Sequence, residues 1–190
     1  MKKGKLLSLL LAAVVGAGSL AMTAQAAPAE LPAQTAKTAA FVKASDWVLK
    51  DDWAIFALGR NQEEGCEKLY EDYYQGVLAL LADPAKLIPS DYIRLSLSLT
   101  AIGIDPRNVE GNDLLEKIDQ ADREKYFQMS TGSLAYALAL MERYPDSFSG
   151  TLKEDTIQKI LGAQQADGSF DYTVEADIRT RTVPLRRCRA

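Results

Sequence analysis

The hydrophobic residues of this chain recur every three to four positions over most of its length. From about residue 36 to residue 170, apolar runs with this period alternate with short polar segments that contain proline, glycine or aspartate. The period places the apolar side chains on one face of an α-helix, whereas a half-buried strand alternates at every second position. No segment alternates with period two for long enough to indicate a strand, so the pattern predicts an all-α protein.

Seven helical segments follow from this pattern, and most are bounded by residues that start or stop helices. Acidic or hydroxyl residues precede several of them, namely Asp51-Asp52, Ser90-Asp91 and Ser130-Thr131, and such side chains cap free backbone amides. Pro84 and Pro145 end others. The predicted helices lie at about residues 39–49, 53–58, 69–81, 92–102, 114–118, 134–141 and 156–161.

The three most apolar of these helices align with one another at a regular spacing. Asp52-Trp53 corresponds to Asp91-Tyr92 and then to Gly132-Ser133, at offsets of 39 and 41 residues. A more amphipathic helix lies between each apolar helix and the next. The unit is therefore a helix pair of about 40 residues, which predicts α/α hairpin repeats stacked as a solenoid or a toroid. HEAT-type solenoids share this length, so the period alone does not select the toroid.

The segment 160–170 predicts a corner between one helix and the next element. The helix is expected to end before Asp167-Gly168, because this pair favours a turn with positive φ. Gln164 is expected to bond backbone groups of the next element, and Phe170 to pack beneath it as an apolar plug. An ordinary helix followed by an Asp-Gly turn is the simpler alternative.

This corner resembles the repeat of the terpenoid cyclase and protein prenyltransferase α/α-toroid superfamily. That repeat has an aliphatic residue, three residues, Gln, a short spacer, Gly, any residue and then Trp or Phe, which Ile160, Gln164, Gly168 and Phe170 match. The resemblance to secreted bacterial members covers about residues 36 to 177. It implies that residues 35–178 form a partial α/α-toroid domain.

The resemblance also implies an open end. A full toroid of this superfamily closes from about six helix pairs, whereas this chain has room for about three and a half. Ile157, Ile160, Leu161 and Phe170 would then form an apolar edge without a neighbouring hairpin to cover it. We therefore expect the chain to be marginally stable on its own or to associate with itself through this edge.

The two ends of the sequence differ from the repeats. Lys2, Lys3 and Lys5 precede an apolar run, and Ala24-Gln25-Ala26 offers a cleavage site, so residues 1–26 are predicted to be a signal peptide and the protein to be secreted. An uncleaved anchor is the alternative, and no membrane span is expected after cleavage. Residues 27–34 are expected to be a flexible leader, and residues 179–190 a basic, disordered tail. That tail indicates either an out-of-frame reading or truncation of a longer toroid, or a natural basic extension.

Charge and composition narrow the possible functions. Removal of residues 1–26 takes away three lysines and no acid, so the formal charge changes from −4 to −7, and the five arginines of the tail leave −12 for residues 27–178. A body this acidic argues against a nucleic-acid partner. The sequence has no histidine, which excludes Ser-His-Asp and Cys-His catalysis and the zinc site of protein prenyltransferases. Neither a metal nor a cofactor is predicted.

The candidate chemistry is therefore binding rather than catalysis. The string Glu175-Ala176-Asp177 lacks the clustered aspartates with which squalene-hopene-type cyclases protonate an alkene. Within the toroid resemblance, Trp53, Tyr92 and Tyr136 lie near the starts of inner helices, where ligands of the superfamily sit, although such rings are also ordinary core residues. The leading hypothesis is a secreted, non-catalytic module that binds a small apolar ligand or a cell-surface component. A terpenoid cyclase or prenyltransferase-like enzyme fragment that lacks its catalytic half is the alternative.

Overall fold

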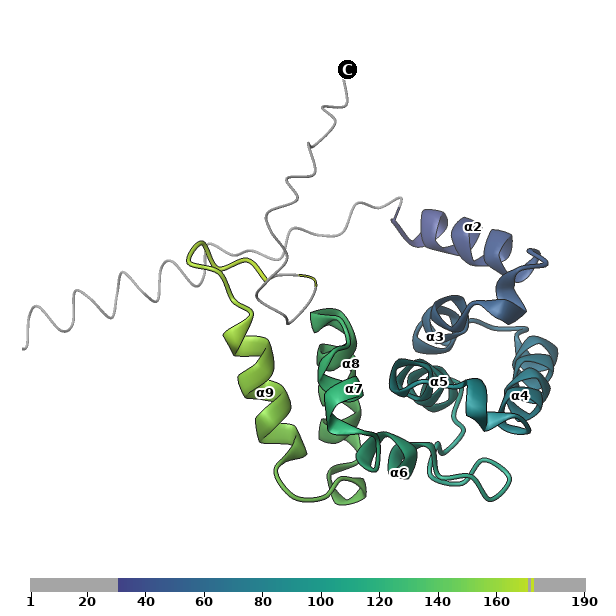
Figure 1. Cartoon of the computed structure of the whole chain (residues 1–190). Coiled ribbons are helices and arrows are strands. Elements are labelled where there is room, and N and C mark those ends of the chain that lie inside the picture. The colour runs from purple at the N-terminus through teal and green to yellow at the C-terminus, as the bar shows by residue number, and fades with distance from the viewer. Residues whose placement is uncertain (1–30, 171, 173–190) are drawn as a thin grey trace, which may run out of the picture. The chain divides into compact units, whose positions relative to one another are not determined.

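The protein is all-α, as the hydrophobic period predicts. A computed structural model describes residues 31–170 and 172, and in that part of the chain it contains helices, turns and two isolated β-bridges but no β-strand (Figure 1). The chain divides into two compact units, residues 1–41 and 42–190. The described part of the first unit is most of one helix, and the second unit contains the rest of the helices. The predicted signal peptide and basic tail lie outside the described residues.

The helices match most of the predicted segments. The α-helices are α2 (Leu31–Lys43), α3 (Asp52–Arg60), α4 (Glu67–Leu81), α5 (Pro89–Ala101), α6 (Leu114–Asp119), α7 (Arg123–Phe127), α8 (Thr131–Arg143) and α9 (Leu152–Gly162). Three short 3-10 helices are η1 (Val48–Lys50), η2 (Pro84–Lys86) and η3 (Pro145–Ser147).

The first predicted helix is wrong. Helix α2 begins at Leu31, inside the expected leader, and it ends at Lys43 rather than continuing through residue 49. Ser45 and Asp46 follow, and such side chains compete with helical hydrogen bonds, so the chain turns there. In η1 only Val48 is buried, so the apolar run 47–49 does not form one continuous helix face.

The acidic and hydroxyl residues predicted at helix starts do act there. The Asp51 carboxylate accepts hydrogen bonds from the amides of Trp53 and Ala54, at 2.9 and 3.2 Å. Ser130 accepts one from the amide of Ser133 at 3.1 Å, at the start of α8. These bonds satisfy amides that have no partner within the helix, so the local sequence determines where α3 and α8 begin.

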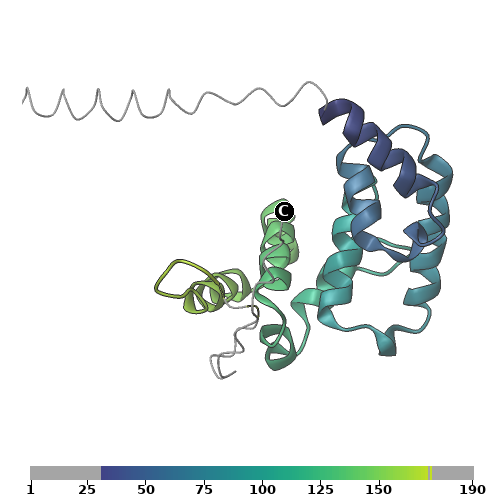
Figure 2. The ribbon, with the colours of Figure 1, turned by 90° about the horizontal axis from the view of Figure 1, so that it is seen from above.

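Helix α5 is the centre of the larger unit. It packs against α3, α6 and α8, while α9 packs against α8 (Figures 1 and 2). Its side chains at Ile93, Leu95 and Leu99 are buried. Helices α3, α5 and α8 are the three apolar helices of the predicted repeat, and α5 lies between the other two.

A buried polar pair joins α7 to α9. The Tyr126 hydroxyl lies 3.1 Å from the Thr156 hydroxyl, and Thr156 also donates to the carbonyl of Leu152 at 2.6 Å. Burial raises the pKa of Tyr126. Helix α7 was not predicted from the sequence because it has five residues and buries a single large side chain.

The predicted corner forms in part. Helix α9 ends at Gly162, and Gly168 has the expected positive φ of 86°. The Gln164 side chain donates to the carbonyl of Gly168 at 3.3 Å, and the Asp167 carboxylate accepts from the amide of Ser169 at 3.0 Å. However, the Phe170 side chain is 46% exposed, so it does not act as a buried plug beneath the corner.

Helices α3 and α5 approach closely where α3 carries a glycine. A Cβ atom at Gly59 would lie 2.7 Å from the carbonyl oxygen of Ala101, a backbone atom that cannot rotate away. We expect Gly59→Ala to destabilise the protein by about 1–3 kcal/mol, since α5 would have to shift. Gly76→Ala in α4 is the matched control, because nothing lies within 4 Å of a Cβ there and alanine favours a helix by up to about 1 kcal/mol. Urea unfolding measures both, and equal effects would contradict the close contact.

Candidate functional site

Two of the three predicted binding rings meet in the structure. The ring centroids of Trp53, at the start of α3, and Tyr136, in α8, are 4.5 Å apart at an angle of 44°. Phe56 contacts Trp53 edge to face at 6.0 Å. Trp53 is half-buried and Tyr136 is 44% exposed, so the pair is open to solvent on one side.

Tyr92 differs from these two rings. It is 8% exposed and belongs to the core around α5, and burial raises the pKa of its hydroxyl. Within the described residues it makes no ring contact with Trp53 or Tyr136. Of the three rings predicted from the sequence, Trp53 and Tyr136 therefore lie together in the structure, and Tyr92 lies apart from them.

A groove lies between α3, α5 and α8, further along the helices that carry this aromatic pair. Its volume is about 420 Å³, within the range of about 300–1,000 Å³ that is typical of small-molecule sites. Its lining is mixed: Arg60 of α3, Arg143 of α8, Gln62 and Thr100 are polar, and the rest are apolar or glycine. The other lining residues are Phe56, Gly59, Leu97, Ala101, Ala139 and Leu140.

The aromatic pair and the arginines lie on the same faces of α3 and α8, and the arginines are the ones that line the groove. Trp53, Phe56 and Arg60 are three and then four residues apart, and this spacing places them on one face of α3. Tyr136 and Arg143 are seven residues apart on α8, which is close to two helical turns. The rings and the guanidinium groups are therefore separated by about 10 Å along each helix, at 1.5 Å per residue.

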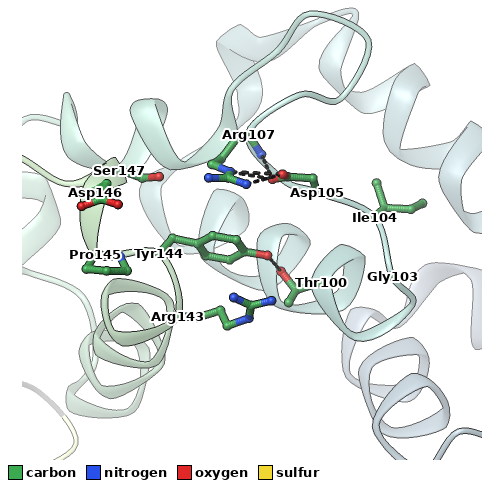
Figure 3. Close-up of a pocket in the computed structure, with 10 residues that line it drawn as sticks. All are labelled: Thr100, Gly103, Ile104, Asp105, Arg107, Arg143, Tyr144, Pro145, Asp146 and Ser147. Atoms are coloured by element: carbon green, nitrogen blue, oxygen red, sulfur yellow. Dashed lines mark hydrogen bonds and ion pairs between the residues drawn. The ribbon is translucent and has the colours of Figure 1, made fainter.

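A smaller polar pocket adjoins the groove (Figure 3). Its volume is about 290 Å³, and Thr100 and Arg143 line both cavities. The Tyr144 hydroxyl lies 3.0 Å from the Thr100 hydroxyl. In Figure 3 the Tyr144 ring lies between the guanidinium groups of Arg107 and Arg143, whose Cζ atoms are 5.3 and 5.1 Å from its centroid. These are cation–π contacts, and they orient Arg143 at the boundary of the two cavities.

Asp105, one of the two aspartates that line this pocket, is already paired with an arginine. Arg107 Nε donates to both carboxylate oxygens of Asp105, at 2.9 and 3.1 Å. The hydrogen bonds from Arg107, together with the nearby charge of Arg143, hold the pKa of the Asp105 carboxyl below its ordinary value. Asp105 is therefore an ionised partner of Arg107 rather than an acid poised to donate a proton.

An apolar surface lies at the C-terminal end of the described residues. Leu161, Phe170 and Tyr172 are exposed, and Ile157 and Ile160 are half-buried. A shallow cavity of about 370 Å³ there is lined by Thr131, Gly132, Ala135, Ile160, Phe170 and Tyr172. We call this surface the α9 edge, and it contains all four residues that the sequence predicted to be uncovered.

The described residues contain no cluster of three His, Cys, Asp or Glu side chains that could hold a metal ion. None of the helices within residues 31–170 is long and apolar enough to cross a membrane. Comparison of the chain with protein-family models, curated proteins and solved structures finds no match. The functional argument therefore rests on the groove and the surfaces described above.

Proposed function

We propose that this chain is a secreted, non-catalytic binding module and that the groove between α3, α5 and α8 holds a small apolar ligand. The groove is the observation that carries this proposal, because it combines a volume suited to a small molecule with apolar side chains and a few polar groups, two of them arginines. The aromatic pair of Trp53 and Tyr136 lies on the same helices and adds apolar surface beyond it.

We further propose that the helices belong to an α/α-toroid array. The alternation of α3, α5 and α8 with other helices along the chain, of which α4 is more amphipathic, supports this proposal, as does the packing of α5 against both α3 and α8. The match of Ile160, Gln164, Gly168 and Phe170 to the superfamily corner is a second support. Secretion is proposed on the N-terminal sequence alone.

The arrangement of acids favours binding over catalysis. Asp51 and Asp91 bond backbone amides at helix starts, with Asp91 accepting from the amide of Ile88 at 2.9 Å. Asp52 accepts a hydrogen bond from the Tyr73 hydroxyl at 2.8 Å and lies 3.8 Å from Arg94, so it holds α3, α4 and α5 together. Each of these carboxylates has a structural partner, and none lines the groove.

Blocking the groove tests the proposal. The full chain is expected to bind the neutral dye Nile red, and Ala139→Trp is expected to weaken this binding at least about tenfold because the indole would fill the groove. Ala139 is an exposed residue of α8, so the change leaves the core intact. Ala79→Trp, at an exposed position of α4, is the matched control and should bind as the wild type does. Equal binding by both variants would refute the groove as the site.

We also propose that the α9 edge covers itself by association with a second copy of the chain. Exposed apolar surface of this kind is costly in water, and the edge of one copy offers the same kind of surface to another. Leu161 at 53% and Tyr172 at 82% exposure contribute most to it.

A further inference from the structure

We propose that the ligand of the groove is a single-chain amphiphile with a carboxylate head group, held by Arg60 and Arg143 while its chain runs toward Trp53 and Tyr136. This inference rests on the proposed function, since it requires that the groove be a binding site. It adds the chemical class of the ligand and the direction in which the ligand lies.

The ion pairs of the arginines carry the argument. The described residues contain five arginines, of which Arg94, Arg107 and Arg123 form ion pairs with aspartates. Arg60 and Arg143 form none with any described residue, and these are the two that line the groove. Acids outnumber bases strongly in residues 27–178, so two guanidinium groups at one cavity, neither in an ion pair with a described residue, are unusual for this chain.

The shape of the site selects an amphiphile rather than a small inorganic anion. Phe56 lies between Trp53 and Arg60 along α3, and Leu140 lies between Tyr136 and Arg143 along α8; both line the groove and offer no hydrogen bonds from their side chains. An alkyl chain over Phe56 and Ala139, which line the groove and are not buried, removes apolar surface from water, which favours binding by about 25 cal/mol per Å². An anionic head group at the two arginines would give the ligand both an apolar and a charged contact, which an inorganic anion does not have.

The neighbouring acid selects a singly charged head group. The negative charge of Asp105 interacts with Arg143, so part of the positive potential at this end of the groove is already offset. A carboxylate carries one charge and matches the planar fork of a guanidinium with two parallel hydrogen bonds. A phosphate would bring a second negative charge toward Asp105, and repulsion would weaken its binding.

A structural role for the two arginines makes a different prediction. Arg60 and Arg143 are the last residues of α3 and α8, where positive charge favours the helix dipole. If that were their only role, neutral variants would lower the melting temperature and leave the choice of ligand unchanged. Ligand preference therefore separates binding from helix stabilisation.

Competition against Nile red on the full chain tests the inference. Decanoate is expected to displace the dye at concentrations about tenfold lower than decanol, and added salt is expected to weaken decanoate alone. The variant Arg60→Gln/Arg143→Gln is expected to lose this preference while decanol binding stays within about twofold of wild type. Lys117→Gln, which removes an exposed charge on α6, is the control and should keep the preference for decanoate over decanol.

A charge reversal guards against loss through misfolding. Arg60→Glu/Arg143→Glu is expected to prefer decylamine to decanoate, which is a gain that an unfolded chain cannot show. Equal displacement by decanoate and decanol from the wild type, or loss of both in the glutamine variant at an unchanged melting temperature, would overturn the inference and leave the proposed function standing. Tighter binding of decyl phosphate than of decanoate would overturn the carboxylate assignment. Failure of every ligand and of Nile red to bind the wild type would refute the proposed function itself.

Discussion

Leu99→Ala is expected to lower the free energy of unfolding by about 2–5 kcal/mol, the usual cost of truncating a fully buried leucine. Leu99 is 0% exposed, and it belongs to the helix against which α3, α6 and α8 pack. The change would leave a cavity between α5 and the helices that pack against it, and the neighbouring side chains can fill this cavity only in part. The loss would be a large fraction of the stability of a domain of this size.

The matched control for this change is Leu80→Ala in α4. The Leu80 side chain is 51% exposed, so its truncation removes little buried surface and should cost no more than about 0.5 kcal/mol. Urea unfolding followed by far-ultraviolet circular dichroism measures both variants. Similar midpoints for the two variants would show that α5 is not the centre of the core.

The chain is expected to self-associate through the α9 edge, and Leu161→Gln/Phe170→Gln is expected to weaken this association at least about tenfold. Both side chains are about half exposed, at 53% and 46%, and burying a large apolar side chain contributes about 1.5–3 kcal/mol. The loss of two such contacts in each copy exceeds what a tenfold change requires. Sedimentation velocity over a range of concentrations measures the effect.

Leu49→Gln/Leu80→Gln serves as the control for association, since these leucines are exposed at 41% and 51% but lie away from the α9 edge. This control should associate as the wild type does. A wild-type chain that stays a monomer at every concentration would contradict the proposed role of the edge. So would equal loss of association in the two variants.

The sequence predicted the helices well where local chemistry determines them. Asp51 and Ser130 cap α3 and α8 through their own side chains, so the boundary is encoded within a few residues. The prediction failed at residues 39–49, where the spacing of apolar residues fits a helix but Trp47 and Leu49 are exposed in the structure. Spacing alone does not tell which apolar residues a distant element covers.

The candidate site was predicted only in part for the same reason. The repeat placed Trp53 and Tyr136 near the starts of two inner helices. Their contact depends on how α3 and α8 both pack beside α5. Arg60 and Arg143 were missed, although each follows its aromatic residue by seven positions. Whether an arginine forms an ion pair within the described part of the chain depends on its three-dimensional neighbours, and the sequence contains no local signal that these two form none there.

The most direct test of the groove is a methyl NMR titration of the full chain with decanoate. The methyl groups of Leu97, Ala139 and Leu140 line the groove, and those of Ile160 and Leu161 report on the α9 edge. We predict saturable shifts of the groove methyl groups at decanoate concentrations that leave the edge signals unchanged. Shifts confined to the edge, or none at any methyl group of the folded chain, would contradict the groove as the ligand site.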